Sequence, residues 1–221
     1  MSRRALVLGA SGGIGSAVAA RLALEDWRVT ALSRKDGLDW RDPARAESVI
    51  GNAIGPFDLV FDATGALEID GAGPEKQLAT IEADAMAAQF AVNAIGPALL
   101  LKHYKSLLPR KGHAVFATLS ARVGSIGDHG LGGWISYRAS KAALNQIVKT
   151  AAVELARTRP EAVVVALHPG TVATTFGSQY RGAREALSPA QSAAQMLAVL
   201  KDLTPAETSG FFAYDGSRVP W

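Results

Sequence analysis

Tyr137 and Lys141 are the two residues of this sequence whose types and spacing most directly suggest catalysis. They are four positions apart, so a helix would place both side chains on one face. A free tyrosine has a pKa of about 10, too high for ready proton exchange at neutral pH. A lysine ammonium beside it would lower that pKa, so the tyrosine could protonate a carbonyl oxygen or deprotonate an alcohol. The same spacing also occurs on ordinary solvated helix faces, so other motifs must decide between the two interpretations.

A glycine-rich segment near the N-terminus, residues 9–15, could bind a phosphate group. It lies between an apolar run at 5–8 and an amphipathic stretch at 14–24, which predicts a strand, a tight turn and a helix. Glycines let the backbone approach a pyrophosphate, and the helix N-terminus offers free N–H groups. The alternative is a tight turn without a ligand. The predicted dinucleotide contacts are Gly9, Ser11, Gly12, Gly13, Ile14 and Gly15.

The end of the next predicted strand suggests which dinucleotide would bind. An acidic residue there would bind the 2′-hydroxyl of NAD, but the sequence has Ser33, Arg34 and Lys35. A guanidinium suits a 2′-phosphate, so NADP(H) is favoured and NAD(H) stays possible. Arg34 could also be an ordinary solvated charge.

Apolar runs and helical stretches alternate along the chain. This alternation predicts an α/β fold with a parallel sheet and helices on both faces, in one domain spanning residues 1–221. A ligand would then bind at the carboxyl ends of the strands. The predicted strands are 5–8, 28–33, 57–63, 113–119, 162–167 and 210–214, with a short strand or strand end at 38–40. The predicted helices are 14–24, 43–50, 83–108 with a kink or boundary near Gly96–Pro97, 136–156 and 188–200.

The composition excludes several other classes of function. The 221 residues include no cysteine, which excludes disulfides and thiol chemistry, and the four histidines show no metal-ligand spacing. The net charge of +3 is dispersed, so we expect neither nucleic-acid binding nor a metal site. The apolar run at 5–8 is too short for a signal peptide or a membrane span, which favours a cytoplasmic protein with no membrane contact.

Together these motifs resemble the short-chain dehydrogenase/reductase family. The resemblance rests on the loop 9–15, the Tyr137-x-x-x-Lys141 pair and the later Pro169-Gly170, and it covers essentially the whole chain. The segments 120–127, 132–134 and 137–145 resemble a narrower branch that includes C-factor-like signalling proteins and short carbonyl reductases.

The resemblance implies a Rossmann-like doubly wound sheet in three αβα layers and hydride transfer between NAD(P)(H) and a carbonyl or alcohol. Tyr137 would be the general acid/base, and Lys141 would tune its pKa and bind the nicotinamide ribose. Asn93 would hold a water that joins Lys141 to a proton relay, unless it only satisfies a helix kink. A homodimer or homotetramer is implied. The other implied cofactor contacts are Asp39 and Trp40 at the adenine, Ala63, Thr64 and Gly65 at the cofactor floor, and Pro169, Gly170, Val172 and Thr174 near the nicotinamide.

The sequence departs from the family pattern most at the catalytic serine. That serine normally precedes a glycine by three positions, and counting back from Gly124 gives Ala121. We predict that Ser120 takes the role, with Ser125 as the alternative and no acting serine as a third possibility. Three smaller departures are Leu8 in place of a threonine, Asp62-Ala63-Thr64-Gly65 in place of Asn-Asn-Ala-Gly, and the lack of a basic residue in the glycine loop.

These observations favour an NADP(H)-dependent reductase of a small carbonyl compound. A dinucleotide-binding signalling or regulatory protein with negligible turnover is the main alternative, and an NAD-dependent alcohol dehydrogenase is a weaker one. The substrate is not readable from the sequence. We expect residues 175–187 to form a lid, and Trp134, Phe176 and Tyr180 either to line an aromatic pocket or to pack within loops.

Overall fold

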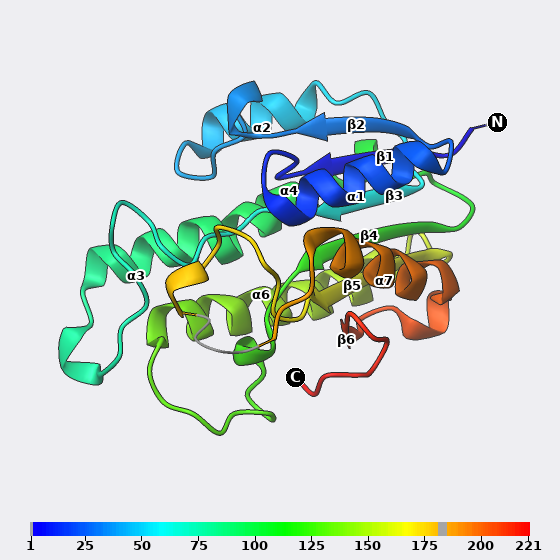
Figure 1. The fold of residues 1–221 in the computed structure, drawn as a ribbon. Coiled ribbons are helices and arrows are strands. Elements are labelled where there is room, and N and C mark those ends of the chain that lie inside the picture. Colours follow the sequence, from blue (N-terminus) through cyan, green and yellow to red (C-terminus); the bar gives the residue numbers. More distant parts are fainter. Residues whose placement is uncertain (1, 181–184) are drawn as a thin grey trace.

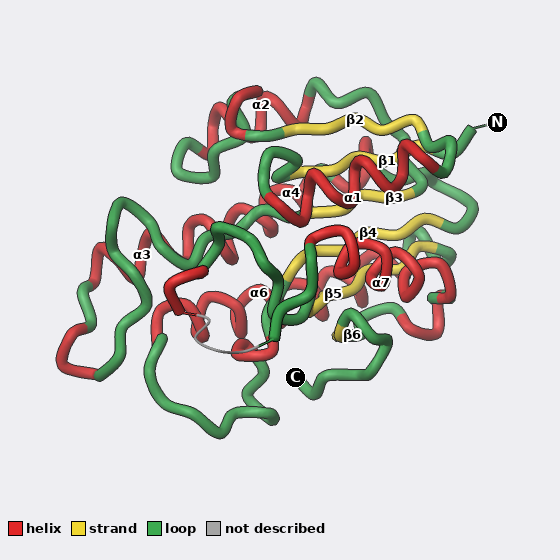
Figure 2. Tube along the Cα trace, in the orientation of Figure 1, coloured by secondary structure: helices red, strands yellow, loops and turns green. Residues whose placement is uncertain are grey.

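Six parallel strands form one sheet in the computed structural model, which describes residues 2–180 and 185–221 (Figures 1 and 2). The strand order is β2-β1-β3-β4-β5-β6, and Leu6 of β1 lies between Thr30 of β2 and Val60 of β3. The predicted parallel sheet is confirmed, and the strand order reverses beside β1, where such sheets bind ligands. The strands are β1 (Arg4–Leu8), β2 (Arg28–Leu32), β3 (Leu59–Asp62), β4 (Ala114–Leu119), β5 (Ala162–His168) and β6 (Phe211–Ala213).

Helices cover both faces of the sheet, which confirms the three-layer prediction (Figure 1). Strand β1 contributes to both cores, because Ala5 and Val7 face α1 and α7 while Leu6 and Leu8 face α2, α4 and α6. The helices are α1 (Gly13–Leu24), α2 (Pro43–Gly51), α3 (Ala83–Phe90), α4 (Gly96–Lys102), α5 (Tyr104–Leu107), α6 (Ile135–Ala156) and α7 (Pro189–Asp202).

The stretch predicted as a long helix with a boundary near Gly96–Pro97 is α3, a π-helical turn at Ala91–Ile95, and then α4 and α5. Pro97 lies in the first turn of α4, directly after the π-helical turn, so the helical hydrogen-bond pattern changes next to this proline. By length and composition alone, Ala83–Lys102 could cross a membrane, with a mean hydropathy of 1.3. In the fold α3 and α4 instead pack against α6, as core helices do.

The predicted strand or strand end at 38–40 is wrong. After β2 the chain turns through a short 3₁₀-helix, Arg34–Asp36, capped by Ser33, whose backbone and side chain both bond to the Asp36 carboxylate. Gly37 then adopts a left-handed conformation, with φ of 92°. This local capping turns the backbone away from the sheet at its edge, so Leu38 and Trp40 are buried as core residues without joining a strand.

Candidate functional site

A long cleft lies along the carboxyl ends of the strands. It consists of two adjoining cavities of about 540 and 570 Å³. The first contains Tyr137 and Lys141, and the second contains Arg34. Both are lined by Gly12, Gly13, Ala63, Thr64, Gly65 and Thr174, so they form one continuous space. The cleft brings together residues that are more than a hundred positions apart in the sequence.

The glycine loop forms the middle of this cleft, and its geometry requires glycine. Gly9 has φ of 74°, and a Cβ there would lie 2.6 Å from the carbonyl oxygen of Ala63. A Cβ on Gly15 would collide with the Gly9 carbonyl, and one on Gly13 with Thr174. Gly12 precedes α1 without a side-chain cap, so the first-turn N–H groups face the cleft unpaired by any described side chain. This arrangement fits a pyrophosphate.

The second cavity holds the residues predicted to contact adenosine. Arg34 is exposed at its edge, beside the buried Ser33. A hydrogen bond from Arg41 holds the pKa of Asp39 below its usual range. Trp40 is buried, and its Nε1 donates to the Thr64 hydroxyl over 3.1 Å. The predicted residues Gly9, Ser11, Ser33, Arg34, Asp39 and Trp40 all line this cavity.

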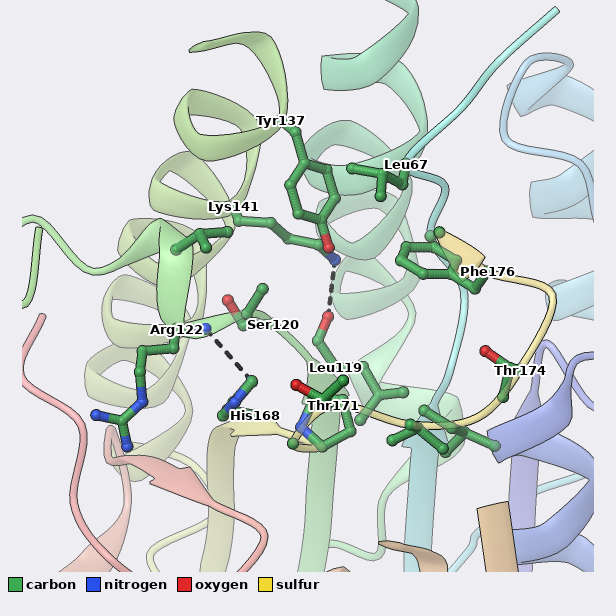
Figure 3. Close-up of a pocket in the computed structure, with 18 of the residues that line it drawn as sticks. Leu67, Leu119, Ser120, Arg122, Tyr137, Lys141, His168, Thr171, Thr174 and Phe176 are labelled. Atoms are coloured by element: carbon green, nitrogen blue, oxygen red, sulfur yellow. Dashed lines mark hydrogen bonds between the residues drawn. The ribbon is translucent and has the colours of Figure 1, made fainter. Parts of the chain in front are cut away.

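Tyr137 and Lys141 reach from adjacent turns of α6 toward the same part of the first cavity (Figure 3). Both are buried, at 6% and 3% exposure, so neither is an ordinary solvated helix residue. The Nζ of Lys141 lies 6.0 Å from the Tyr137 ring centroid and donates a 2.8 Å hydrogen bond to the Leu119 carbonyl. Phe176 lies across the cavity, 6.4 Å from the tyrosine ring.

The expectation that Lys141 lowers the pKa of Tyr137 is not met here. Burial raises the pKa of Tyr137, because removing a phenolate from water costs free energy. Burial likewise lowers the pKa of Lys141 to about 8, although the charge of Asp62 partly opposes this shift. The tyrosine therefore keeps its proton at neutral pH, which is the form that can protonate a carbonyl oxygen.

Asp62 replaces an asparagine of the resembled pattern, and it organises the floor between the cavities. It is fully buried at the end of β3 and accepts hydrogen bonds from the Thr64 hydroxyl at 2.6 Å and the Thr118 hydroxyl at 2.7 Å. Burial raises the pKa of this carboxyl group. Thr64 in turn accepts from Trp40. The hydrogen-bond network that asparagine would make is thus replaced by a chain from Trp40 through Thr64 to Asp62.

Comparison with known sequences decides the family. The model of the family described as Enoyl-(Acyl carrier protein) reductase matches residues 37–219. The 1-hydroxy-2-glutathionyl-2-methyl-3-butene dehydrogenase of Rhodococcus sp. (strain AD45) is 31% identical, over 98% of this chain and 98% of that protein. The chain belongs to the short-chain dehydrogenase/reductase family. It is an oxidoreductase of this family, as the resemblance implied.

Two further relatives place the chain within this family. The C-signal of Myxococcus xanthus is 34% identical over 76% of this chain and 94% of that protein. A short-chain dehydrogenase/reductase structure from Burkholderia multivorans with bound NADP superposes with a TM-score of 0.81 at 26% identity, covering all of both chains. The Rossmann-like fold is therefore confirmed.

Neither candidate serine presents a free hydroxyl to Tyr137. Ser120 borders the first cavity, but its Oγ donates a 2.6 Å hydrogen bond to Oδ1 of Asn145 on α6. Ser125 does not line the cleft; its hydroxyl donates to the Pro220 carbonyl and accepts from the Asp128 N–H. The structure therefore gives Ser125 a role in holding the C-terminal tail. Ala121, at the position of the family serine, faces the cavity instead.

Asn93 is fully buried in the π-helical turn, and it does not line the cleft. Its side chain brackets the Ala66 backbone, accepting from the N–H at 2.9 Å and donating to the carbonyl at 2.8 Å. Its Nδ2 also donates to Gln89. Gly65 separates it from Lys141, because a Cβ on Gly65 would be 3.0 Å from Asn93 Oδ1 and 3.4 Å from Lys141 Nζ. The water relay stays a prediction.

The remaining predicted contacts line the first cavity, and the lid is partly described. Phe176 and Tyr180 belong to the predicted lid 175–187, of which residues 181–184 lie outside the described part of the chain. The Trp134 ring lies 5.8 Å from Tyr180, and both face the cavity, which supports the aromatic-pocket interpretation. The predicted residues here are Ile14, Gly15, Ala63, Thr64, Gly65, Pro169, Gly170, Val172 and Thr174.

Five polar residues of the first cavity were not predicted: Arg122, Asp128, Arg138, His168 and Thr171. The Nδ1 of His168 accepts from the Arg122 N–H at 3.4 Å, and burial lowers the pKa of His168 to about 4, so it is neutral (Figure 3). For Arg138 and His168, a position next to a motif residue was the sequence signal that could have identified them. Arg138 directly follows Tyr137, and His168 directly precedes Pro169.

Proposed function

We propose that this protein reduces a small carbonyl compound with NADP(H), with Tyr137 as the proton donor. The observation that carries the proposal is the pairing of Tyr137 and Lys141 in one cavity that continues to the glycine loop. Such a cleft can hold a dinucleotide along its length with the reacting carbonyl at the tyrosine end. The lid aromatics would shield this end from water.

The cofactor, when bound, supplies the hydride that reaches the carbonyl carbon. The chain's own residues would then manage the proton and the charge. Tyr137 holds its proton because its pKa is raised, and it would donate that proton to the carbonyl oxygen. The protonated Lys141 beside it would stabilise the phenolate that remains. The first-turn N–H groups of α1 would bind the pyrophosphate.

Two observations support NADP(H) over NAD(H). Arg34 is exposed at the end of the second cavity, where a 2′-phosphate would lie, and no described carboxylate forms an ion pair with it. The Burkholderia multivorans relative carries bound NADP. A planar guanidinium suits a phosphate because it can make two parallel hydrogen bonds. Asp39 would not substitute as a ribose acceptor, since Arg41 already occupies its carboxylate.

The test is NADPH oxidation across a panel of small aldehydes, ketones and quinones, with wild type and Tyr137→Phe in parallel. General acid catalysis typically contributes about 10²–10⁴ in rate, so turnover should fall by that factor. NADPH binding, followed by fluorescence, should be retained in the variant. Equal turnover in both proteins would remove Tyr137 from the mechanism.

A second candidate function is cofactor-dependent signalling with negligible turnover. It is favoured by Ala121 in place of the family serine and by the similarity to the C-signal of Myxococcus xanthus. This candidate predicts tight NADPH binding, unaffected by Tyr137→Phe, and no oxidation with any member of the panel.

We also propose a homo-oligomer paired through helices, since Val153 of α6 and Ile95 are exposed apolar residues. The cytoplasmic location of this protein stays a prediction.

A further inference from the structure

Arg138 is a half-buried cation in the wall of the first cavity, one residue after Tyr137. Its Nε donates to the Gly133 carbonyl at 2.9 Å. Its Nη1 lies 3.4 Å from the Val123 carbonyl and 3.3 Å from His129 Nδ1. Its Nη2 has no hydrogen-bond acceptor in the described part of the chain, so two N–H donors of the guanidinium stay available.

The charge of Arg138 has no carboxylate partner in the described part of the chain. No carboxylate of residues 2–180 or 185–221 forms an ion pair with it, and residues 1 and 181–184 include no acidic residue. Arg122, in the same cavity wall, shows the contrast, because it pairs with Asp128 at 2.8 Å. Burial lowers the pKa of Arg138, which reflects the cost of taking this cation out of water. A guanidinium in that position is suited to a ligand anion.

The residues around Arg138 indicate which kind of ligand anion could bind there. The cavity wall beside it carries the rings of Trp134 and Tyr137, whose centroids are 6.3 Å apart. Leu131 and Val123 also line this end. An apolar body, a carbonyl near Tyr137 and a single negative group at Arg138 would match these three features. The pyrophosphate of a dinucleotide belongs to the glycine loop, at the other side of the cavity, and so would leave Arg138 free.

We propose that the substrate is a carbonyl compound that carries a carboxylate, and that Arg138 binds this carboxylate through Nη2. The inference rests on the proposed function and deepens it by naming the substrate class. The carboxylate takes no part in the chemistry. Hydride adds to the carbonyl carbon, Tyr137 gives its proton to the carbonyl oxygen, and the product is the corresponding hydroxy acid with oxidised cofactor.

Arg138 could instead serve only to hold the loop between Val123 and Gly133, and the test must separate the two roles. We would use 4-(hydroxymethyl)benzoate and its methyl ester, which have the same aromatic body and differ in the charge. With NADPH-loaded protein neither alcohol can be oxidised, so calorimetric titration measures binding alone. The proteins are wild type, Arg138→Met, Arg138→Lys and the control Arg157→Met, which removes an exposed charge after α6.

We expect wild type to bind the acid about tenfold to a hundredfold more tightly than the ester, the range for a hydrogen bond to a charged group. Arg138→Met should abolish this preference while leaving ester binding unchanged, and Arg138→Lys should restore part of it. Arg157→Met should behave as wild type. Equal binding of acid and ester by wild type would overturn the proposal. So would an equal loss of both ligands in Arg138→Met, the result expected for a loop-holding role.

A parallel turnover measurement keeps this inference separate from the proposed function. The substrates are 4-carboxybenzaldehyde and its methyl ester, with NADPH oxidation as the readout. Reduction of both at equal kcat/KM would support the reductase and overturn the carboxylate site. Selective binding of the acid without any reduction would support the site and count against the reductase.

Discussion

Restoring a hydroxyl at position 121 should make this protein a faster reductase. Ala121 lines the cavity two positions after the end of β4, and its backbone is extended, with φ of −144° and ψ of 143°. Serine adopts that conformation without strain. An Ala121→Ser hydroxyl would therefore add one donor to the part of the cavity where negative charge develops on the carbonyl oxygen. Neither candidate serine offers a free hydroxyl proton there, because the Ser120 hydroxyl donates to Asn145 and the Ser125 hydroxyl donates to Pro220.

The size of the effect follows from what one such donor contributes. Removing an established oxyanion donor costs about 10²–10³ in kcat. An introduced serine must also lose rotamer freedom, because it lies in a partly exposed part of the cavity wall. We therefore expect kcat to rise about tenfold, which corresponds to the lower end of the range for a hydrogen bond to a charged group. Because the new interaction is made mainly in the transition state, kcat and kcat/KM should rise together. Ser120→Ala is the matched control, since it removes a hydroxyl that already has a partner.

The assay is saturating-NADPH turnover of one aldehyde by wild type, Ala121→Ser and Ser120→Ala. Ser120→Ala should keep its turnover within about threefold while losing about 1–2 kcal/mol of folding stability, because Asn145 is left with an unpaired buried oxygen. A folded Ala121→Ser protein with unchanged NADPH affinity and less than a twofold gain would refute the reasoning. It would mean that position 121 does not face the reacting oxygen.

Three further predictions test other parts of the site. Arg34→Ala should raise the KM for NADPH about fivefold to tenfold and leave that for NADH unchanged; an equal change for both cofactors would remove Arg34 from 2′-phosphate recognition. Burial lowers the pKa of Lys141 to about 8, so the folded chain releases this proton before the unfolded chain does. The free energy of unfolding of wild type relative to Lys141→Met should therefore rise between about pH 8 and pH 10, by on the order of 2 kcal/mol, in urea titrations. Ser125→Ala should lower the melting temperature by a few degrees, about 1 kcal/mol, with kcat within about twofold; a large loss of kcat at unchanged stability would return Ser125 to the catalytic machinery.

The sequence by itself determined the architecture and the location of the cleft. Alternating apolar runs and helical stretches predicted the parallel sheet, because strands buried on both faces must be apolar throughout. Pro43 and Ser188–Pro189 predicted two helix starts, since a first-turn proline and, at Ser188, a capping side chain act locally. The residues of the glycine loop and of the Tyr137–Lys141 face were also predictable, because both depend on spacings within a few positions.

Only the tertiary structure decided how the polar groups are used. Ser120 bonds to Asn145, Ser125 to Pro220 and Asn93 to Ala66, and each partner is 25 or more positions away in the sequence. The direction of the Tyr137 pKa shift likewise depends on how deeply packing buries the ring, which no local pattern reports. The mistaken strand at 38–40 differs from these cases because it has a local cause, the capping of Arg34–Asp36 by Ser33 and the left-handed Gly37. What packing alone decided there is that Leu38 and Trp40 join the core on one face of the sheet.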